Sequence, residues 1–304
     1  HPQVWFARKE AGIRSTCILK YLEDVFIICR EKQYNIRRMK CKKRDFRNNY
    51  INYVLNTADV CGRYGMKVLV IPDVHLKLWM FQAAEKIMEE GMAERAVCLM
   101  DIPDDWNQEY NLTLYAQTFD AAIAFAEKYP DTLWAYGNHD LSYIWDERES
   151  GYSAAAAQIV REKLEELKKA LPEGNEIRYV QKIDSVLFCH GGVLEYFVKN
   201  TVPGSKYDDV DETLRIINSL SREYIWNNIS PVWHRPQYTA GKLYKSEEIL
   251  QVVGHTPVER IYREGNMISC DVFSSYRDGK PIGTEEFLVL DTETWDFSGI
   301  KGRD

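Results

Sequence analysis

The chain has 304 residues, 45% of them hydrophobic, and a mean hydropathy of −0.42. These values are typical of a folded globular protein and argue against a disordered one. No apolar run approaches the ~20 residues that span a bilayer, and the first residues lack the basic, apolar and small-residue order of a secretory signal. We therefore expect a cytoplasmic protein with no membrane partner.

Charge divides the chain near Gly65. Residues 1–65 hold 14 Lys and Arg against 6 Asp and Glu, a net of +8, whereas residues 66–304 hold 25 against 40, a net of −15. We interpret residues 1–65 as a basic N-terminal extension and residues 66–304 as one domain. Because that domain is acidic, with no extended basic face around its motifs, we expect no nucleic-acid partner.

Residues 1–65 have three alternative interpretations. They are a basic accessory region, a partly ordered arm packed on the domain, or translated sequence upstream of a start at Met66. The abrupt charge change, the first residue being His1, and four of the seven cysteines in this segment favour the third. We then expect a chain that begins at Met66 to keep full turnover and thermal stability. A large loss of either would show that the segment belongs to the fold.

From Met66 onward, short apolar runs alternate with longer amphipathic segments. This alternation predicts a layered α/β domain. The predicted strands are residues 67–71, 95–100, 132–136, 185–189, 250–253, 267–273 and 287–293. The predicted helices are residues 79–92, 114–129 and 154–171.

Polar side chains follow five of these strands directly. They are Asp73 and His75, Asp101, the run Asn138-His139-Asp140, His190, and His255. Loops meet at the carboxyl edge of an open α/β sheet, so we expect these groups to share one cleft. Asp73 and His75, two residues apart on an extended backbone, are expected to point the same way.

This mixture of carboxylate, amide and imidazole groups is typical of two-metal hydrolysis. Two divalent cations ~3.5–4 Å apart need a bridging carboxylate, oxygen and nitrogen ligands, and a position for a nucleophilic water. Such ligands suit Mn²⁺, Fe²⁺ or Zn²⁺, and the lack of thiolates argues against a structural zinc site. The glycines beside Asn138, His190 and His255 are expected to let the backbone approach the ions.

The order D-x-H, D-x-x-D, G-N-H-D, H-G and G-H resembles that of the calcineurin-like metallophosphoesterases. The matching segments are "DVH", "DIPDD", "GNHD", "CHGG" and "GHTP", across roughly residues 66–260. The resemblance implies an α/β fold with two mixed β-sheets sandwiched between helices in four layers, α/β/β/α. It also implies two divalent metal ions (Mn²⁺, Fe²⁺ or Zn²⁺) and the hydrolysis of phosphoesters by a metal-bridging hydroxide.

The resemblance also implies a role for each matching residue. The ligands of the first metal are Asp73, His75 and Asp101, and those of the second are Asp101, Asn138, His190 and His255. His139 is either the general acid for the leaving oxygen or the group that steadies the transferring phosphoryl, and Asp104 orients its ring. Asp140 is expected to hold the G-N-H-D loop rather than to bind metal.

The chain departs from the family pattern at several positions. Many relatives have Gly before the first and the bridging Asp, where this chain has Pro72 and Met100. The "GHTP" segment lacks the second His of G-x-H, so the first metal is expected to hold one more water and bind less tightly. Phosphoprotein phosphatases have Arg at the position of Asp105, which argues against that class.

The segment "WHRP" offers a replacement for the missing Arg. Arg235 is our candidate for phosphate binding. His234 is a second substrate-binding candidate, with a plain loop histidine as its alternative. We expect a phosphomonoester or a small nucleotide as substrate. A phosphoprotein phosphatase, a dinucleoside polyphosphate hydrolase and a catalytically silent binding scaffold are the alternatives.

Overall fold

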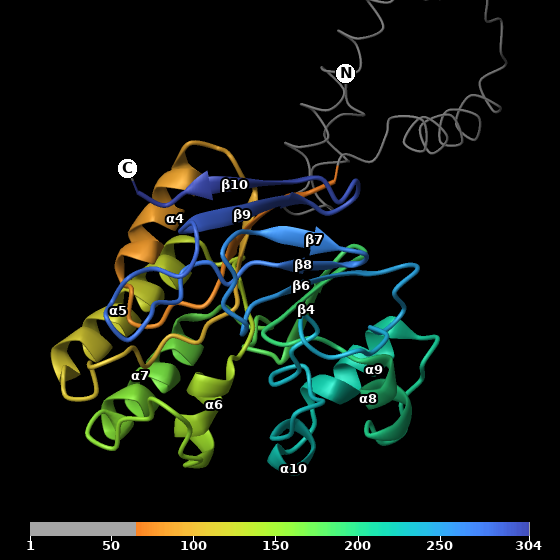
Figure 1. The fold of residues 1–304 in the computed structure, drawn as a ribbon, viewed down its shortest axis with the longest axis horizontal. Helices are drawn as coiled ribbons and strands as arrows, with labels where there is room; N and C mark the ends of the chain where they lie inside the picture. Colours follow the sequence, from red (N-terminus) through yellow and green to blue (C-terminus); the bar gives the residue numbers. More distant parts are fainter. Residues whose placement is uncertain (1–64, 304) are drawn as a thin grey trace, which may run out of the picture. The chain divides into compact units, whose positions relative to one another are not determined.

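The computed structural model describes residues 65–303 (Figure 1). The predictions for the basic extension fall on residues 1–64 and lie outside the described residues. The boundary near residue 65 therefore stays a prediction.

The first sheet has five strands in the order β10-β9-β1-β2-β3. Their bounds are Phe297–Lys301 for β10, Glu286–Asp291 for β9, Lys67–Ile71 for β1, Arg95–Cys98 for β2 and Leu133–Trp134 for β3. Strands β1, β2 and β3 are parallel, whereas β9 is antiparallel to both β1 and β10. The sheet is therefore mixed, and its parallel part carries the motifs near the start of the domain.

The second sheet also has five strands, in the order β4-β5-β6-β8-β7. Their bounds are Val180–Ile183 for β4, Val186–Cys189 for β5, Leu250–Val253 for β6, Met267–Ser269 for β8 and Tyr262–Glu264 for β7. Strands β5, β6 and β8 are parallel, and the outer strands β4 and β7 are antiparallel to their neighbours. This sheet is mixed as well.

Seven helices are present in residues 65–303. They are α4 (Trp79–Glu89), α5 (Leu112–Lys128), α6 (Asn138–Trp145), α7 (Ala157–Ala170), α8 (Glu195–Asn200), α9 (Val210–Asn218) and α10 (Arg222–Ile225). Local capping explains two of their starts, because Asn111 accepts a hydrogen bond from Leu114 N and Asp209 accepts one from Glu212 N. No helix in this part of the chain is both long and apolar enough to cross a membrane.

Alternate side chains of the central strands enter different layers of the core. Val68 and Val70 of β1 lie between the sheets, in one cluster with Phe188 of β5 and Val252 of β6. Leu69, the residue between the two valines, faces the other way, into a cluster formed with α4, α5 and α7. Helices α8, α9 and α10 cover the outer face of the second sheet in the same manner (Figure 1). The predicted four-layer α/β/β/α arrangement is confirmed.

The predicted strands are correct in place, but four of the seven, those over 95–100, 132–136, 267–273 and 287–293, are too long at their carboxyl ends. The strand expected over 95–100 ends at Cys98, and the one expected over 267–273 ends at Ser269. Met100 and Asp101 have φ angles of 53° and 44°, which no β-strand accommodates. Strands β4, β7 and β10 and helices α6, α8, α9 and α10 were not predicted, because each is short, and β7 and β10 also have several exposed side chains.

Candidate metal centre

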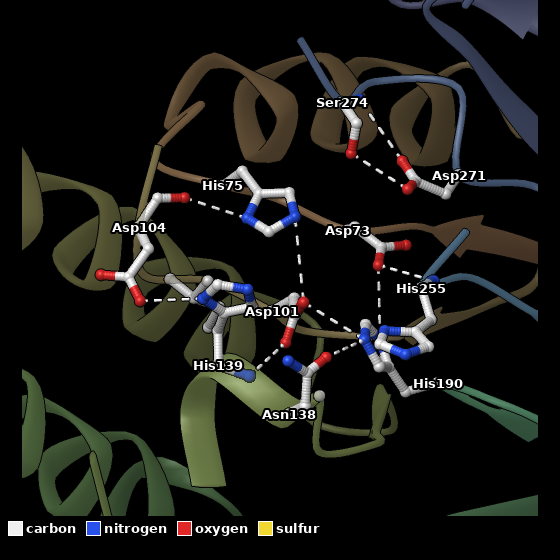
Figure 2. Close-up of polar contacts among 12 residues, drawn as sticks. Asp73, His75, Asp101, Asp104, Asn138, His139, His190, His255, Asp271 and Ser274 are labelled. Atoms are coloured by element: carbon white, nitrogen blue, oxygen red, sulfur yellow. Dashed lines mark hydrogen bonds and ion pairs between the residues drawn. The ribbon is translucent and has the colours of Figure 1, made fainter. Parts of the chain in front are cut away.

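The polar groups at the strand ends converge at one edge of the two sheets. Figure 2 shows them as a single constellation drawn from β1, β2, β5 and β6 and from the start of α6. The contributing residues are Asp73, His75, Asp101, Asp104, Asn138, His139, His190 and His255. The prediction that these groups from distant segments meet agrees with their positions, while the role of each residue stays a proposal.

Asp73, His75 and Asp101 form a group that can hold a metal ion. Each offers one ligand atom, and these atoms all lie within 4.8 Å of one another. Asp73 and Asp101 are buried, whereas His75 is partly exposed, which leaves access from solvent. Two carboxylates and an imidazole are donors that divalent transition metals accept.

The predicted reason why Asp73 and His75 meet is wrong. We expected an extended backbone, but His75 and the following Leu76 have φ angles of 43° and 58°, in the left-handed region. The turn remains attached to the neighbouring loop, because His75 N donates to Asp101 O at 2.8 Å. A strained turn, which costs of order 1 kcal/mol or more per residue, therefore brings the two side chains together.

The ring of His75 is held in a fixed orientation. Its Nδ1 lies 2.9 Å from the backbone oxygen of Asp104, and a carbonyl oxygen only accepts, so Nδ1 carries the proton. This leaves the lone pair on Nε2, which lies 3.8 Å from Asp101 Oδ2. Burial lowers the pKa of His75, which also favours the neutral ring that binds cations.

Asn138, His190 and His255 lie on the other side of Asp101. His190 Nε2 is 3.0 Å from Asn138 Oδ1 and 3.2 Å from Asp101 Oδ2, so one ring nitrogen faces two oxygens. The rings of His190 and His255 have centroids 4.7 Å apart. Asp101 thus lies between this set and the group that contains His75, as a bridging carboxylate would.

Several buried atoms at this edge lack a hydrogen-bond partner within the described structure. They are Asp73 Oδ2, His190 Nδ1, which has only a 3.4 Å ion-pair contact with Asp73 Oδ1, and His255 Nε2. A buried polar atom without a partner costs about 1–3 kcal/mol, so three of them in one place call for a bound group. A carboxylate oxygen and imidazole nitrogens are ligand atoms that bind divalent cations in proteins. The residues therefore fit a metal.

Two glycines make room for the buried carboxylates. A Cβ on Gly137 would lie 1.9 Å from Asp101 Oδ1, and one on Gly254 would lie 2.1 Å from Asp73 Oδ2. Contacts this short do not occur, so no larger residue fits at either position without displacing a carboxylate. The further expectation that these glycines let the backbone approach the ions stays a prediction.

His139 and Asp104 form the pair that the resemblance implies. His139 Nδ1 lies 2.8 Å from Asp104 Oδ2, and Tyr115 Oη donates to Asp104 Oδ1 at 2.7 Å. Tyr143 Oη donates to the same oxygen. Burial favours the neutral ring of His139, but the charges of Asp101 and Asp104 outweigh it and raise its pKa to about 9. The carboxylate therefore orients the ring and favours its protonated form.

Asp140 holds the G-N-H-D loop, as expected. Its Oδ2 accepts hydrogen bonds from Gly137 N and Asp101 N, both at 2.9 Å, and its Oδ1 accepts one from Ile102 N at 3.1 Å. These three bonds tie the first turn of α6 to the loop that carries the bridging carboxylate. Met100, where many relatives have Gly, has a φ of 53° on the same loop, and the bonds from Asp140 stabilise that strained backbone.

The two substrate-binding candidates lie differently. Arg235 Nη1 donates to the backbone oxygen of His255 and lies 3.3 Å from Thr256 Oγ1, so its guanidinium is next to the centre. The ring of His234 is buried, and its Nε2 lies 3.4 Å from Thr239 Oγ1. Burial lowers the pKa of His234. These contacts favour Arg235 over His234 as a group that meets substrate.

One buried carboxylate at this edge was not predicted. Asp271 is 1% exposed and lies beside Asp73 and His75 in Figure 2. The strand predicted over 267–273 includes Asp271, whereas the observed strand ends at Ser269. The rule that polar residues after a strand mark the site would have found Asp271 had that end been recognised.

The described residues 66–276 match the family model of the calcineurin-like phosphoesterases. The chain belongs to this family. The match covers every candidate metal ligand and Asp271. The resemblance inferred from the motifs is thereby confirmed, and so is membership of a family of metal-dependent phosphoester hydrolases. No curated protein gives a significant sequence match.

Several solved structures are similar to this metallophosphoesterase chain. A novel archaeal phosphodiesterase is 18% identical, with 77% of this chain and 99% of that one covered and a TM-score of 0.37. A metallophosphoesterase from Sphaerobacter thermophilus is 14% identical, with 79% and 89% covered and a TM-score of 0.36. YfcE, a phosphoesterase from E. coli, is 12% identical, with 78% and 100% covered and a TM-score of 0.33. At such identities a neighbour's substrate does not transfer to this chain.

Proposed function

We propose that this metallophosphoesterase hydrolyses a phosphomonoester or a small nucleotide-type substrate with two divalent cations. Asp73, His75 and Asp101 would hold the first cation, and Asp101, Asn138, His190 and His255 the second. When bound, the cations would polarise the phosphoryl group and lower the pKa of a water to near neutrality. Mn²⁺, Fe²⁺ and Zn²⁺ all suit these donors.

The observation that carries this proposal is the charge balance of the buried residues. Five carboxylates are buried in residues 65–303, those of Asp73, Asp101, Asp104, Asp140 and Asp271, while no Lys or Arg side chain in this range is. Burial favours the neutral rings of His139 and His190, but Asp101 outweighs it and raises both pKa values to about 9, so the two imidazoles supply at most two positive charges. Burying an unpaired charge is costly, so the cluster needs further positive charge. Burial and the neighbouring carboxylates raise the pKa of Asp73 well above its usual range, which bound cations would reverse.

The protein's own groups divide the remaining tasks. His139 Nδ1 is occupied by Asp104, so Nε2 is the atom that holds a proton for the leaving oxygen. The His139 side chain is 16% exposed against 3% for Asp104, so the imidazole is on the open side of the pair. Arg235 Nη1 donates a hydrogen bond to the backbone oxygen of His255. The other guanidinium donors, Nη2 and Nε, are then free to bind a phosphoryl oxygen.

The substrate class rests on the departure at Asp105. The carboxylate at this position lies 3.2 Å from Lys77 Nζ, so the place where phosphoprotein phosphatases carry Arg holds an ion pair. This favours a small substrate over a phosphoprotein, with a phosphoprotein and a dinucleoside polyphosphate as the alternatives. A cytoplasmic location is part of the same proposal.

Removal of metal is the direct test. We expect a chelator to reduce hydrolysis of p-nitrophenyl phosphate or bis-p-nitrophenyl phosphate to background, and added Mn²⁺ to restore it, with two metal ions bound per chain. Metal content is measured by elemental analysis of the same samples. If both compounds stay intact with Mn²⁺ bound, the protein is not a phosphoesterase of this kind.

A further inference from the structure

Asp271 occupies the same place after β8 that His255 occupies after β6. The two strands are parallel, and Val253 of β6 pairs with Ser269 of β8. His255 and Asp271 each come two residues after the paired position, at the same edge of the sheet. The pattern of a polar side chain at the end of each strand thus extends to one more strand than the motifs cover.

The Asp271 carboxylate is held in position by local hydrogen bonds. Ser274 Oγ donates to Oδ2 at 3.0 Å, and Ser274 N lies 3.3 Å from Oδ1. The backbone oxygen of Asp271 accepts a hydrogen bond from Val258 N at 2.8 Å, which ties Asp271 to the loop that carries His255. Polar groups therefore hold this carboxylate, but none of these contacts supplies a positive charge.

The neighbours of Asp271 are candidate ligands of the first cation. Asp271 lies beside Asp73 in Figure 2, and after burial it is the strongest influence that raises the pKa of Asp73. Burial raises the pKa of Asp271 as well, and His75 opposes that rise. Asp271 is not part of the group whose ligand atoms lie within 4.8 Å of one another. Its effect on a cation would therefore come through its charge and through the ligands beside it, not through direct coordination.

We propose that Asp271 is a positioning residue that strengthens binding of the cation at Asp73, His75 and Asp101 by placing a buried negative charge beside them. This inference rests on the proposed function. The charge of Asp271 would offset part of the affinity that the missing second His of "GHTP" is expected to cost the first site. Outer groups that hydrogen-bond to metal ligands typically contribute about 10–100-fold to metal affinity, and we expect a buried charge beside the ligands to have an effect of the same order.

The test compares Asp271→Asn with Ser274→Ala in the full chain after metal removal. Calorimetric titration with Mn²⁺ is expected to show two ions bound by the parent protein. In Asp271→Asn, we expect one of them to bind about 10–100-fold more weakly. Ser274→Ala keeps the charge and removes one hydrogen bond, so its Mn²⁺ affinities should stay within a few fold. Asp271→Ser is a second neutral variant in case Asp271→Asn does not fold.

Thermal unfolding separates this role from a purely structural one. Removing a negative charge from beside Asp73 should leave the metal-free Asp271→Asn protein at least as stable, while the gain in Tm from Mn²⁺ becomes smaller. Lower metal-free stability with unchanged Mn²⁺ affinity would assign Asp271 a structural role only. If the parent protein binds Mn²⁺ and Asp271→Asn binds it equally well, this inference is wrong and the proposed function stands. A parent protein that binds no Mn²⁺ overturns both.

Discussion

Asp101→Asn is expected to lower kcat by on the order of 10³-fold at saturating Mn²⁺ while the fold is kept. The carboxylate lies between the two candidate sites, with Oδ2 at 3.8 Å from His75 Nε2 and 3.2 Å from His190 Nε2. An amide keeps the shape but removes the charge and offers a single oxygen. Loss of one electrostatic group in an active site costs about 10²–10³-fold, and here one group is shared by both cations. Steady-state hydrolysis of p-nitrophenyl phosphate measures the effect.

The same substitution discriminates between an enzyme and a binding scaffold. A scaffold would keep its partner when Asp101 becomes Asn, and parent and variant would show the same low hydrolysis. His139 N donates to Asp101 Oδ1 at 2.8 Å, and an amide oxygen still accepts this bond, so the start of α6 should persist. Circular dichroism and thermal unfolding verify that. Equal turnover of parent and variant would contradict the enzyme proposal.

His139→Gln should lower kcat by about 10²–10⁴-fold without loss of bound metal, as expected for a general acid. The ring is not among the candidate ligands, and its Nδ1 faces Asp104 at 2.8 Å. The loss should be larger for an alkyl phosphate than for p-nitrophenyl phosphate, because p-nitrophenolate leaves readily without a proton. The two rates are compared at the same Mn²⁺ occupancy.

Asp104→Asn is the matched control for His139. It leaves the imidazole in place and weakens only its orientation, so the loss in kcat should be smaller than that for His139→Gln. Because Tyr115 also donates to Asp104, some loss of stability is expected as well. For His139→Gln, equal losses in kcat on the alkyl phosphate and on p-nitrophenyl phosphate would indicate that His139 steadies the phosphoryl group rather than protonating the leaving oxygen.

Strand positions were predictable because the central strands are buried on both faces. The segments 67–71 and 250–253 read as continuous apolar runs, and the structure has strands with the same bounds. The edge strand β10 has no buried residue, because three of its five residues are exposed and two are half-buried, and this gives no such run. The formation of edge strands depends on pairing with a neighbour, as β10 pairs with β9, and pairing is not visible in local composition.

Strand ends were predicted less well, and this affected the candidate site. At Met100 and Asp101 a left-handed backbone ends the strand, although Met100 is apolar and looks like a continuation of it. After Ser269, the apolar residues on either side of Asp271 likewise look like a continuation of the strand. They concealed the strand end that places Asp271 at the centre. Left-handed φ angles at non-glycine residues are held by tertiary contacts, such as the hydrogen bond from Asp101 N to Asp140, and local preference does not predict them.

The sequence by itself determined the layered α/β architecture, the family and the residues at the strand ends, because apolar runs and ligand-type side chains are local features. Only the tertiary structure decided how these residues meet. It placed Asp101 between His75 on one side and His190 and His255 on the other, turned the backbone at His75, and brought Asp271 next to Asp73 across nearly two hundred positions. Such contacts arise from sheet pairing and burial between distant segments, and no spacing within one segment contains that information.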